Sequence, residues 1–407
     1  MDYTPKVANF LPLFLLLFLF LFGKAFSQEK KTYEILPAPD IWYNDIDGIR
    51  IGASITGQVP GTFDDGPHRI DAGLWLGTWI PDDPVSYYFN YTQPIRAISD
   101  FGSEGNIQAT SLFRAGFQRH GAGFTKRWQQ GFNETNYIES GVFYHVEKRF
   151  NRRYAQFPIL WSNELNGILS PFISYRGENS LGRILLDAKG FFQTLDNPFT
   201  SGKITVAQTV PLGENLGFKI RLFAGASSND ADPEYRFSRS ISQQIEWMDS
   251  GFTRAKGTIP NSFLTGGNFN VAGGPNLRGY SGDDFKSFDR GKPFLVNSMG
   301  ALNAEFDYPT PIGRIFNDIP FIGEFLDFRS YLFYDMGTPL GITENEVDKV
   351  FTDAGGGFSI SFNLPDAMGK PRGFVFRYEI PFWLSEPGRT NEVRYRSLVG
   401  IGAVITF

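Results

Sequence analysis

Apolar and polar residues alternate with a period of two along most of this chain, and convincing helical periodicity is scarce. In Gly373–Ile380 the apolar side chains share one face, namely Phe374, Phe376, Tyr378 and Ile380. The same alternation recurs in residues 182–189, 217–224 and 355–364. Such segments form β-strands whose two faces meet different surroundings. The sequence therefore predicts an all-β fold.

Strand length separates the two architectures that alternation allows, a soluble β-sandwich and a membrane barrel. The predicted strands are about ten residues long, which suits a tilted crossing of a bilayer, whereas strands in soluble proteins are usually five or six residues long. Aromatic residues crowd near strand ends, as in Tyr87–Phe89 and Phe382–Trp383, where outer-membrane barrels carry aromatic girdles. A closed sheet also pairs every backbone group in lipid without helices. We therefore expect a transmembrane antiparallel β-barrel.

About sixteen strands are predicted, an even number, as is usual for single-chain bacterial barrels. The eleven before residue 250 lie near Gly48–Gln58, Ile70–Ile80, Ser86–Ile95, Gly105–Gly116, Gly121–Gln129, Asn136–Arg149, Ser170–Glu178, Leu181–Gln193, Gly202–Leu212, Asn215–Ser227 and Tyr235–Trp247. The last five lie near Asn297–Tyr308, Arg329–Gly337, Gly355–Asn363, Gly373–Pro381 and Val393–Phe407. The barrel is expected over residues 41–407, after a short periplasmic lead-in over residues 28–40.

The N-terminus has the features of a secretory signal peptide over residues 1–27. Lys6 precedes an apolar run over residues 10–22, and Ala25 and Ser27 form a small-x-small cleavage pattern. The run is shorter than the ~20 apolar residues of a spanning helix, so cleavage after Ser27 is favoured over a retained anchor.

The C-terminus ends on an apolar, alternating strand with a terminal Phe. Its apolar face is formed by Ile401, Ala403, Ile405 and Phe407. This pattern resembles the sorting signal of outer-membrane barrels, so we expect export to the outer membrane of a Gram-negative bacterium.

Composition excludes several other classes of protein. The chain has no cysteine, which rules out a disulfide scaffold, a thiolate zinc site, a Cys nucleophile and a lipoprotein anchor. A formal net charge of −5 argues against a nucleic-acid partner. The three histidines, His68, His120 and His145, lack metal-site spacing, and no nucleophile elbow or phosphate loop occurs. We predict no metal, no cofactor and no catalytic residue.

The longest gap between predicted strands runs from about Ser250 to Pro293 and is rich in glycine. A loop of this length inside a compact domain is usually functional or disordered. Near its centre lie Leu277, Arg278, Gly279 and Tyr280. Here the sequence resembles the outer-membrane assembly and translocation barrels of the BamA, TamA and FhaC type, also called bacterial surface antigen barrels. In that family a loop inserts back into the lumen with an Arg-Gly-aromatic tip.

Four later segments agree with that family in the same order. They are a Glu-Phe…Pro strand, an Asp-x-Gly strand, a glycine-rich strand start and the penultimate strand, at residues 304–311, 333–338, 355–358 and 374–382. The resemblance covers the C-terminal third well, and the rest of the chain by strand count and length.

The parity of the strands gives an independent argument for the loop tip. Glu305 and Asp335 fall on the polar faces of their strands, so both carboxylates should face the lumen, where the planar guanidinium of Arg278 can dock against one or both. The alternative is that all three are ordinary solvated charges. Gly279 is expected to permit a close backbone approach or a positive φ.

The resemblance implies a role in protein insertion or translocation, through a seam between the first and last strands that Gly400 and Gly402 would weaken. In that family POTRA domains usually receive client chains, and residues 28–40 are too short to form one. We therefore expect a POTRA-less barrel with a periplasmic or surface protein partner in trans. This partner could be an assembly factor or a peptidase, since residues 41–52 resemble the start of family barrels fused behind a zinc aminopeptidase.

Outer-membrane lipid and lipopolysaccharide are the other expected partners. Two further functions stay open at this point. One is a passive porin-like channel with the long loop as its constriction. The other is a barrel hydrolase, although no Ser–His pairing stands out in the sequence.

Overall fold

The structure is a computed structural model. It describes residues 32–404 apart from residues 45, 60–67, 101, 130–135, 214–215, 249–260, 268, 272, 313–314, 316–325, 341–348, 365–371 and 389. The expected signal peptide, and Ile405 and Phe407 of the expected sorting strand, lie outside the described residues. Within the described part, no helix is both long and apolar enough to cross a membrane.

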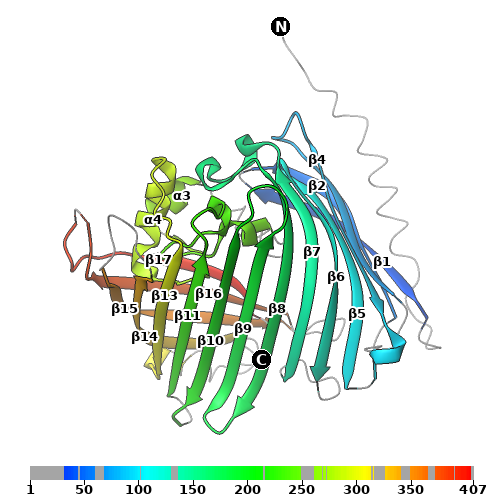
Figure 1. Ribbon diagram of the computed structural model, residues 1–407. Helices are drawn as coiled ribbons and strands as arrows, with labels where there is room; N and C mark the ends of the chain where they lie inside the picture. The colour runs from blue at the N-terminus through cyan, green and yellow to red at the C-terminus, as the bar shows by residue number, and fades with distance from the viewer. Residues whose placement is uncertain are drawn as a thin grey trace, which may run out of the picture.

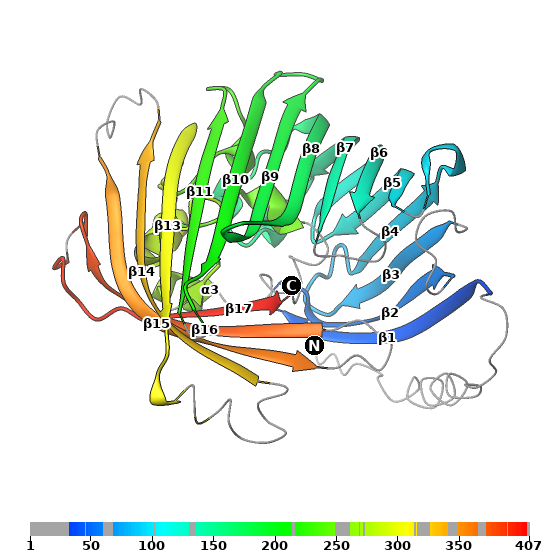
Figure 2. The ribbon, with the colours of Figure 1, turned by 90° about the horizontal axis from the view of Figure 1, so that it is seen from below.

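One curved sheet dominates the molecule, and its strands follow an arc when viewed from below (Figures 1 and 2). Sixteen strands pair antiparallel, each with the next along the chain. They are β1 Glu34–Asn44, β2 Gly48–Gln58, β3 Arg69–Gly77, β4 Val85–Pro94, β5 Ser103–Arg114, β6 Phe117–Gln129, β7 Tyr137–Arg149, β8 Leu165–Asn179, β9 Gly182–Gln193, β10 Thr200–Pro211, β11 Gly217–Ser227, β13 Ser298–Tyr308, β14 Leu326–Pro339, β15 Phe351–Leu364, β16 Arg372–Leu384 and β17 Leu398–Val404. A seventeenth strand, β12 (Phe269–Asn270), pairs in parallel with β17.

The two faces of the sheet differ as the period-two pattern predicted. In β13, Asn303 and Asp307 are buried, whereas Phe306 and Tyr308 point outward and are 38% and 36% exposed. Along this part of β13 the hydrophobic side chains therefore lie on the convex face, and the polar side chains line the concave face. The predicted all-β, antiparallel barrel architecture is confirmed, with strands mostly of 9 to 15 residues.

The first strand corrects the predicted boundary of the lead-in. Residues 34–40 belong to β1, which pairs with β2 along its whole length, so the expected lead-in over residues 28–40 overlaps a strand. The sequence analysis did not predict this strand because it contains Pro37 and Pro39, and proline is depleted in strands. Edge strands tolerate proline, since one side of the backbone needs no partner.

The expected strand Tyr235–Trp247 is wrong. This segment forms two 3-10 helices, η4 (Pro233–Tyr235) and η5 (Gln244–Met248), joined by irregular chain. Its polar residues are buried as well as its apolar ones: Ser240 is 0% exposed and bonds to Asp284. The alternation of polar and apolar residues in this segment therefore belongs to a loop that is buried on both of its sides. Because this error and the missed β1 offset each other, the predicted total of sixteen matches the antiparallel strands.

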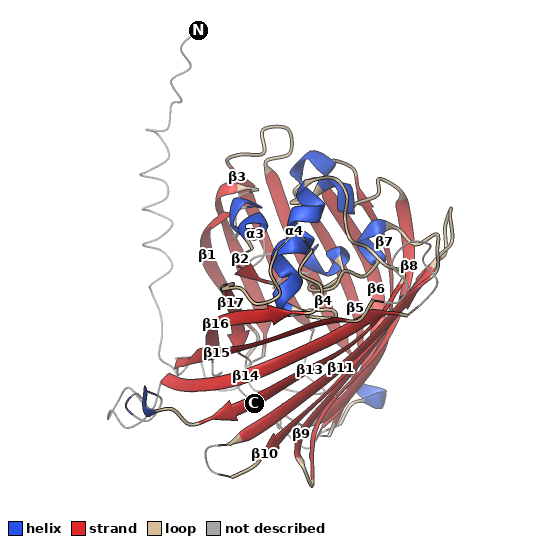
Figure 3. Cartoon of the chain, turned by 90° about the vertical axis from the view of Figure 1, so that its left-hand side faces the viewer, coloured by secondary structure: helices blue, strands red, loops and turns tan. Residues whose placement is uncertain are grey.

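The described residues among 228–297, between β11 and β13, form what we call the lumen loop. It contains η4, η5, α3 (Asn261–Gly266), β12, η6 (Arg278–Tyr280) and α4 (Ser281–Asp289). Figure 3 shows α3 and α4 surrounded by strands near one end of the molecule. The loop shares a hydrophobic core with the barrel wall, in which Phe285 and Ile241 pack with Phe157 of the β7–β8 connection and with Phe191 of β9. The lumen loop is therefore a packed plug.

In the part of the chain that the structure describes, the sheet is open between its first and last strands. Among the described residues, no backbone ladder joins β1 to β17. The outer edge of β17 is instead paired with β12 over two residues.

Candidate functional site

The tip of the lumen loop is held by an ion pair between Arg278 and Asp335 of β14. Arg278 is 1% exposed, and its Nε and Nη2 donate to Oδ2 and Oδ1 of Asp335, both at 2.7 Å. The backbone N–H of Arg278 also donates to Asp335 Oδ2, at 3.2 Å. This two-pronged geometry is the strongest that a guanidinium and a carboxylate form, and it fixes orientation as well as position.

Two more carboxylates complete the site. Arg278 Nη1 donates to Glu305 Oε1 of β13 at 2.8 Å and to Glu379 Oε1 of β16 at 2.9 Å. The guanidinium carbon also lies 3.9 Å from the ring centroid of Phe333, a cation–π contact. One loop side chain thus binds three strands of the barrel wall. We call Arg278, Glu305, Asp335 and Glu379 the docking cluster.

A second arginine forms ion pairs with two carboxylates of the docking cluster. Arg377 of β16 donates to Glu305 Oε1 at 2.5 Å and lies 3.2 Å from Glu379 Oε1. Tyr331 donates to the same Glu379 oxygen at 3.0 Å. Burial would lower the pKa of Arg278, but attraction by Asp335 and Glu379 outweighs burial and raises that pKa well above its ordinary value. The cluster is therefore a fixed charge network suited to positioning the loop.

The structure brings together the three charged residues singled out in the sequence, Arg278, Glu305 and Asp335. It adds Glu379, which the sequence analysis did not place in the site. The signal was present, because Glu379 shares a face of its strand with Arg377 in the same period-two pattern that located the other carboxylates.

The neighbours of Arg278 at the tip are packed against the wall. Leu277 and Tyr280 are 0% exposed, and the Tyr280 hydroxyl donates to the Thr352 carbonyl at 3.1 Å. A Cβ on Gly279 would lie 2.8 Å from Asp353 Cβ. Gly279 thus makes the close backbone approach, and its φ is not in the left-handed region.

A second buried ion pair stabilises the loop internally. Asp284 of α4 is 0% exposed and accepts from Arg239 Nε and Nη2, at 2.8 and 2.6 Å. It also accepts from the backbone N–H and the hydroxyl of Ser240, at 3.0 and 2.8 Å. Burial nevertheless raises the pKa of Asp284. The plug is therefore preorganised by its own contacts as well as by the wall.

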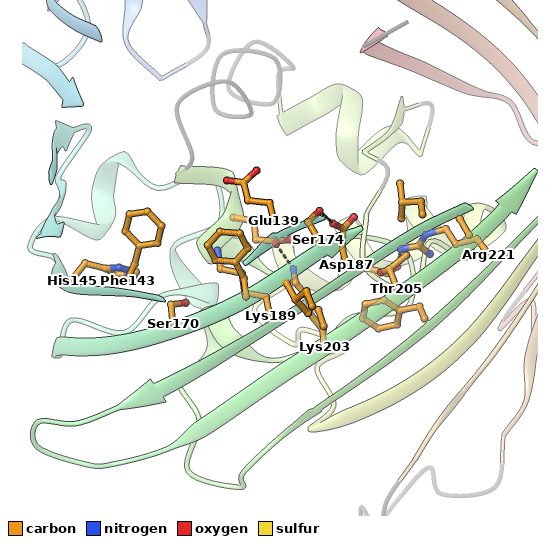
Figure 4. A pocket seen from close by; sticks show the side chains of 18 of the residues that line it. Glu139, Phe143, His145, Ser170, Ser174, Asp187, Lys189, Lys203, Thr205 and Arg221 are labelled. Carbon is orange, nitrogen blue, oxygen red and sulfur yellow. Dashed lines mark hydrogen bonds and ion pairs between the residues drawn. The ribbon is translucent and has the colours of Figure 1, made fainter. Parts of the chain in front are cut away.

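A cavity of about 740 Å³ lies between the loop and the wall of β5–β11. Figure 4 shows its charged lining, including Glu139, Asp187, Lys189, Lys203 and Arg221. Lys189 and Lys203 are direct neighbours across the β9–β10 ladder, and Lys203 pairs with Glu246 of the loop. The described residues contain no group of three or more metal-ligating side chains.

The structure also forms one Ser–His pair that the sequence analysis missed. Ser111 Oγ and His120 Nδ1 lie 2.8 Å apart on neighbouring strands β5 and β6. Within the described residues, no hydrogen bond orients the other ring nitrogen of His120. The pair therefore lacks the third member that a hydrolytic triad needs.

The remaining predicted residues belong to the last strand. Ile401 and Ala403 lie in β17, whose residues 398–404 pair with β16.

No protein-family model and no curated protein matches the chain, but solved structures do. The BamA barrel of Haemophilus ducreyi lacking POTRA domains 1–3 is similar with a TM-score of 0.50 and 15% identity, over 93% of this chain and 71% of that chain. CdiB from Escherichia coli gives a TM-score of 0.45 and 9% identity, over 93% and 64%. OccK11 from Pseudomonas aeruginosa gives 0.30 and 9%, over 90% and 91%. At the level of the fold, the likeness to BamA confirms the resemblance found in the sequence.

Proposed function

We propose that this chain is an outer-membrane barrel that helps polypeptides to insert into or cross the membrane, alone or as the membrane module of a partner protein. The observation that carries this proposal is the docked loop beside an open seam. Arg278 fixes the plug to β13, β14 and β16, while β1 and β17 share no ladder in the described part of the chain. A plugged lumen, together with a wall that lacks a backbone ladder between β1 and β17 in its described part, favours lateral passage over free diffusion through a pore.

The physical basis would be exchange of backbone hydrogen bonds at the seam. An open strand edge presents unpaired N–H and C=O groups, which pair readily with another extended chain. In lipid such groups cost several kcal/mol each if left unpaired, so an edge that accepts an incoming strand lowers the barrier to its insertion. Outer-membrane lipid and lipopolysaccharide would surround the barrel, and an assembly factor or peptidase in trans would supply or process the client.

The test is an insertion assay in liposomes. The purified protein is reconstituted, a urea-unfolded small barrel protein is added, and the client's folding is followed by its heat-dependent shift on a gel. Folding should be faster than in empty liposomes and than in liposomes that hold a passive porin. Equal rates in all three, with the reconstituted barrel shown to be folded, would exclude the proposal.

A passive channel is the second candidate, and the cavity of about 740 Å³ favours it. Conductance in planar bilayers separates the two functions. A plug held by the docking cluster predicts a small steady current that rises in Arg278→Ala. A large current in the unaltered protein, unchanged by this substitution, would favour the channel.

A further inference from the structure

Both edges of β17 make backbone pairs, and on the outer edge the partner, over two residues, is an unexpected segment. Residues 398–404 pair antiparallel with β16 on one side. On the other side β12 pairs in parallel, with Phe269 beside Val399 and Asn270 beside Gly400. In the part of the chain that the structure describes, Val399 and Gly400 of the last strand are thus paired on this edge with the lumen loop and not with the first strand.

β12 is anchored at both of its residues. The hydroxyl of Ser281, at the start of α4, donates to the Phe269 carbonyl at 3.0 Å. Asn270 Nδ2 donates to Glu379 Oε2, also at 3.0 Å. The other oxygen of this carboxylate accepts from Arg278. The same wall residue therefore holds the loop tip and β12.

The outer edge of β1 is poorly equipped to take the place of β12. The N–H of Thr78 donates to the carbonyl of Ile49, so the odd-numbered residues of β2 turn their backbone groups to β3 and the even-numbered ones to β1. Even-numbered residues of β2 pair with even-numbered residues of β1. The odd-numbered residues of β1 hence turn outward. Pro37 and Pro39 are among them, and proline has no N–H.

Five residues of β1 turn outward, at positions 35, 37, 39, 41 and 43, and two adjacent ones in this row lack a donor. A ladder along this edge would lose two hydrogen bonds at its middle. Proline on an edge strand is a known means of preventing unwanted strand pairing. The sequence of β1 thus acts against closure of the sheet.

We propose that the outer edge of β17 is a strand-docking surface whose resident occupant is β12, and that the prolines of β1 keep the first strand from displacing it. This inference rests on the function proposed above, because it names what controls the seam. While β12 is bound, the outer edge of β17 at Val399 and Gly400 is unavailable to any other strand. Release of the loop from the docking cluster frees this edge.

The natural chain has no cysteine, so an engineered disulfide tests the pairing directly. The variant Phe269→Cys/Val399→Cys joins two paired residues, and mild oxidation in native membranes should cross-link most of it. The matched control Phe269→Cys/Tyr43→Cys places the second thiol on β1 and should stay reduced. Cross-linking of the control but not of the first variant would overturn the proposal.

The role of the prolines is tested in the first cysteine variant. Pro37→Thr/Pro39→Thr restores two outward N–H groups, each of which makes a bond of modest net strength. The ratio of β12-paired to unpaired protein should fall roughly five- to 140-fold, measured as the rate of cross-linking. Ala38→Thr adds no outward donor and should leave the rate unchanged. An unchanged rate in the double threonine variant would overturn this part of the proposal.

The insertion assay then separates control of the β17 edge by β12 from the proposed function. The oxidised cysteine variant should not insert the client, and reduction should restore insertion. Equal rates before and after reduction, with the disulfide formed, would overturn control by β12. If the reduced protein and the unaltered protein both fail to insert, the proposed function fails, while the cross-linking rates still decide whether β12 occupies the edge.

Discussion

Replacing Arg278 with alanine is the perturbation that the structure defines best. It removes four side-chain hydrogen bonds, two to Asp335 and one each to Glu305 and Glu379. The two glutamates keep Arg377 as a cation. Asp335, at 0% exposure, loses its only ion-pair partner among the described residues.

The magnitude follows from that unpaired carboxylate. Removing one partner of a buried ion pair costs about 3–5 kcal/mol, because the remaining charge stays buried without a counter-ion. Asp335 would keep two neutral donors, the N–H of residue 278 and Asn303 Nδ2. Each 1.4 kcal/mol is a factor of ten in an equilibrium constant. The ratio of docked to undocked loop should therefore fall by roughly two to three and a half powers of ten.

Limited proteolysis measures that ratio. Arg290 is exposed at the end of α4, and trypsin cuts after it once the plug opens locally. The cleavage rate is proportional to the population of the open form when the plug recloses fast. The rate at this bond, identified by mass spectrometry, should rise in Arg278→Ala. The second variant Arg278→Ala/Asp335→Asn removes the stranded charge and should regain a large part of the protection.

Two results would refute the reasoning. One is a cleavage rate in Arg278→Ala within about threefold of the unaltered protein, since that corresponds to less than about 1 kcal/mol. The other is a double variant no better protected than the single one, because the cost would then not come from the carboxylate.

Three other expectations can be checked separately. Gly279→Ala should weaken docking by about 1–3 kcal/mol, because its Cβ would lie 2.8 Å from Asp353 Cβ; unchanged tryptic cleavage would contradict this. Tyr280→Phe removes the donor to the Thr352 carbonyl and should cost about 0.5–1.5 kcal/mol, seen as a lower urea midpoint. Burial raises the pKa of Glu234 in η4 to about 8, so the folded protein keeps a proton that the unfolded chain releases near pH 4.5. Stability should fall as the pH rises across that window, and Glu234→Gln should flatten the fall; an equal slope in both proteins would contradict the assignment.

The fold was predictable because alternation is set locally by the two faces of a strand. Where the faces did not differ, prediction failed. The segment 235–247 alternates, but both of its sides are buried, with Ser240 bonded to a carboxylate of α4. β1 was missed for a different reason. It contains Pro37 and Pro39, which are acceptable in a strand only where one edge of that strand is free. An edge is a property of the whole sheet, which no local window of sequence contains.

The site was predictable to the extent that motif order and strand parity determine it. Both place Glu305 and Asp335 on the inward face near the loop. Glu379 required knowing that β16 lies close enough to β13 for one guanidinium to reach both strands. The pairing of Asp284 with Arg239 depends on how the loop folds back on itself, and no periodicity encodes that.

The order of the docking cluster along the chain has a consequence for biogenesis. Arg278 precedes each carboxylate that binds it, by 27, 57 and 101 residues. During synthesis, which runs from the N-terminus, the tip therefore emerges before any of its anchors exist. Contacts so distant in sequence form late, so the plug would dock only after the C-terminal hairpins have assembled. A polypeptide truncated before β16 would have an incompletely docked tip.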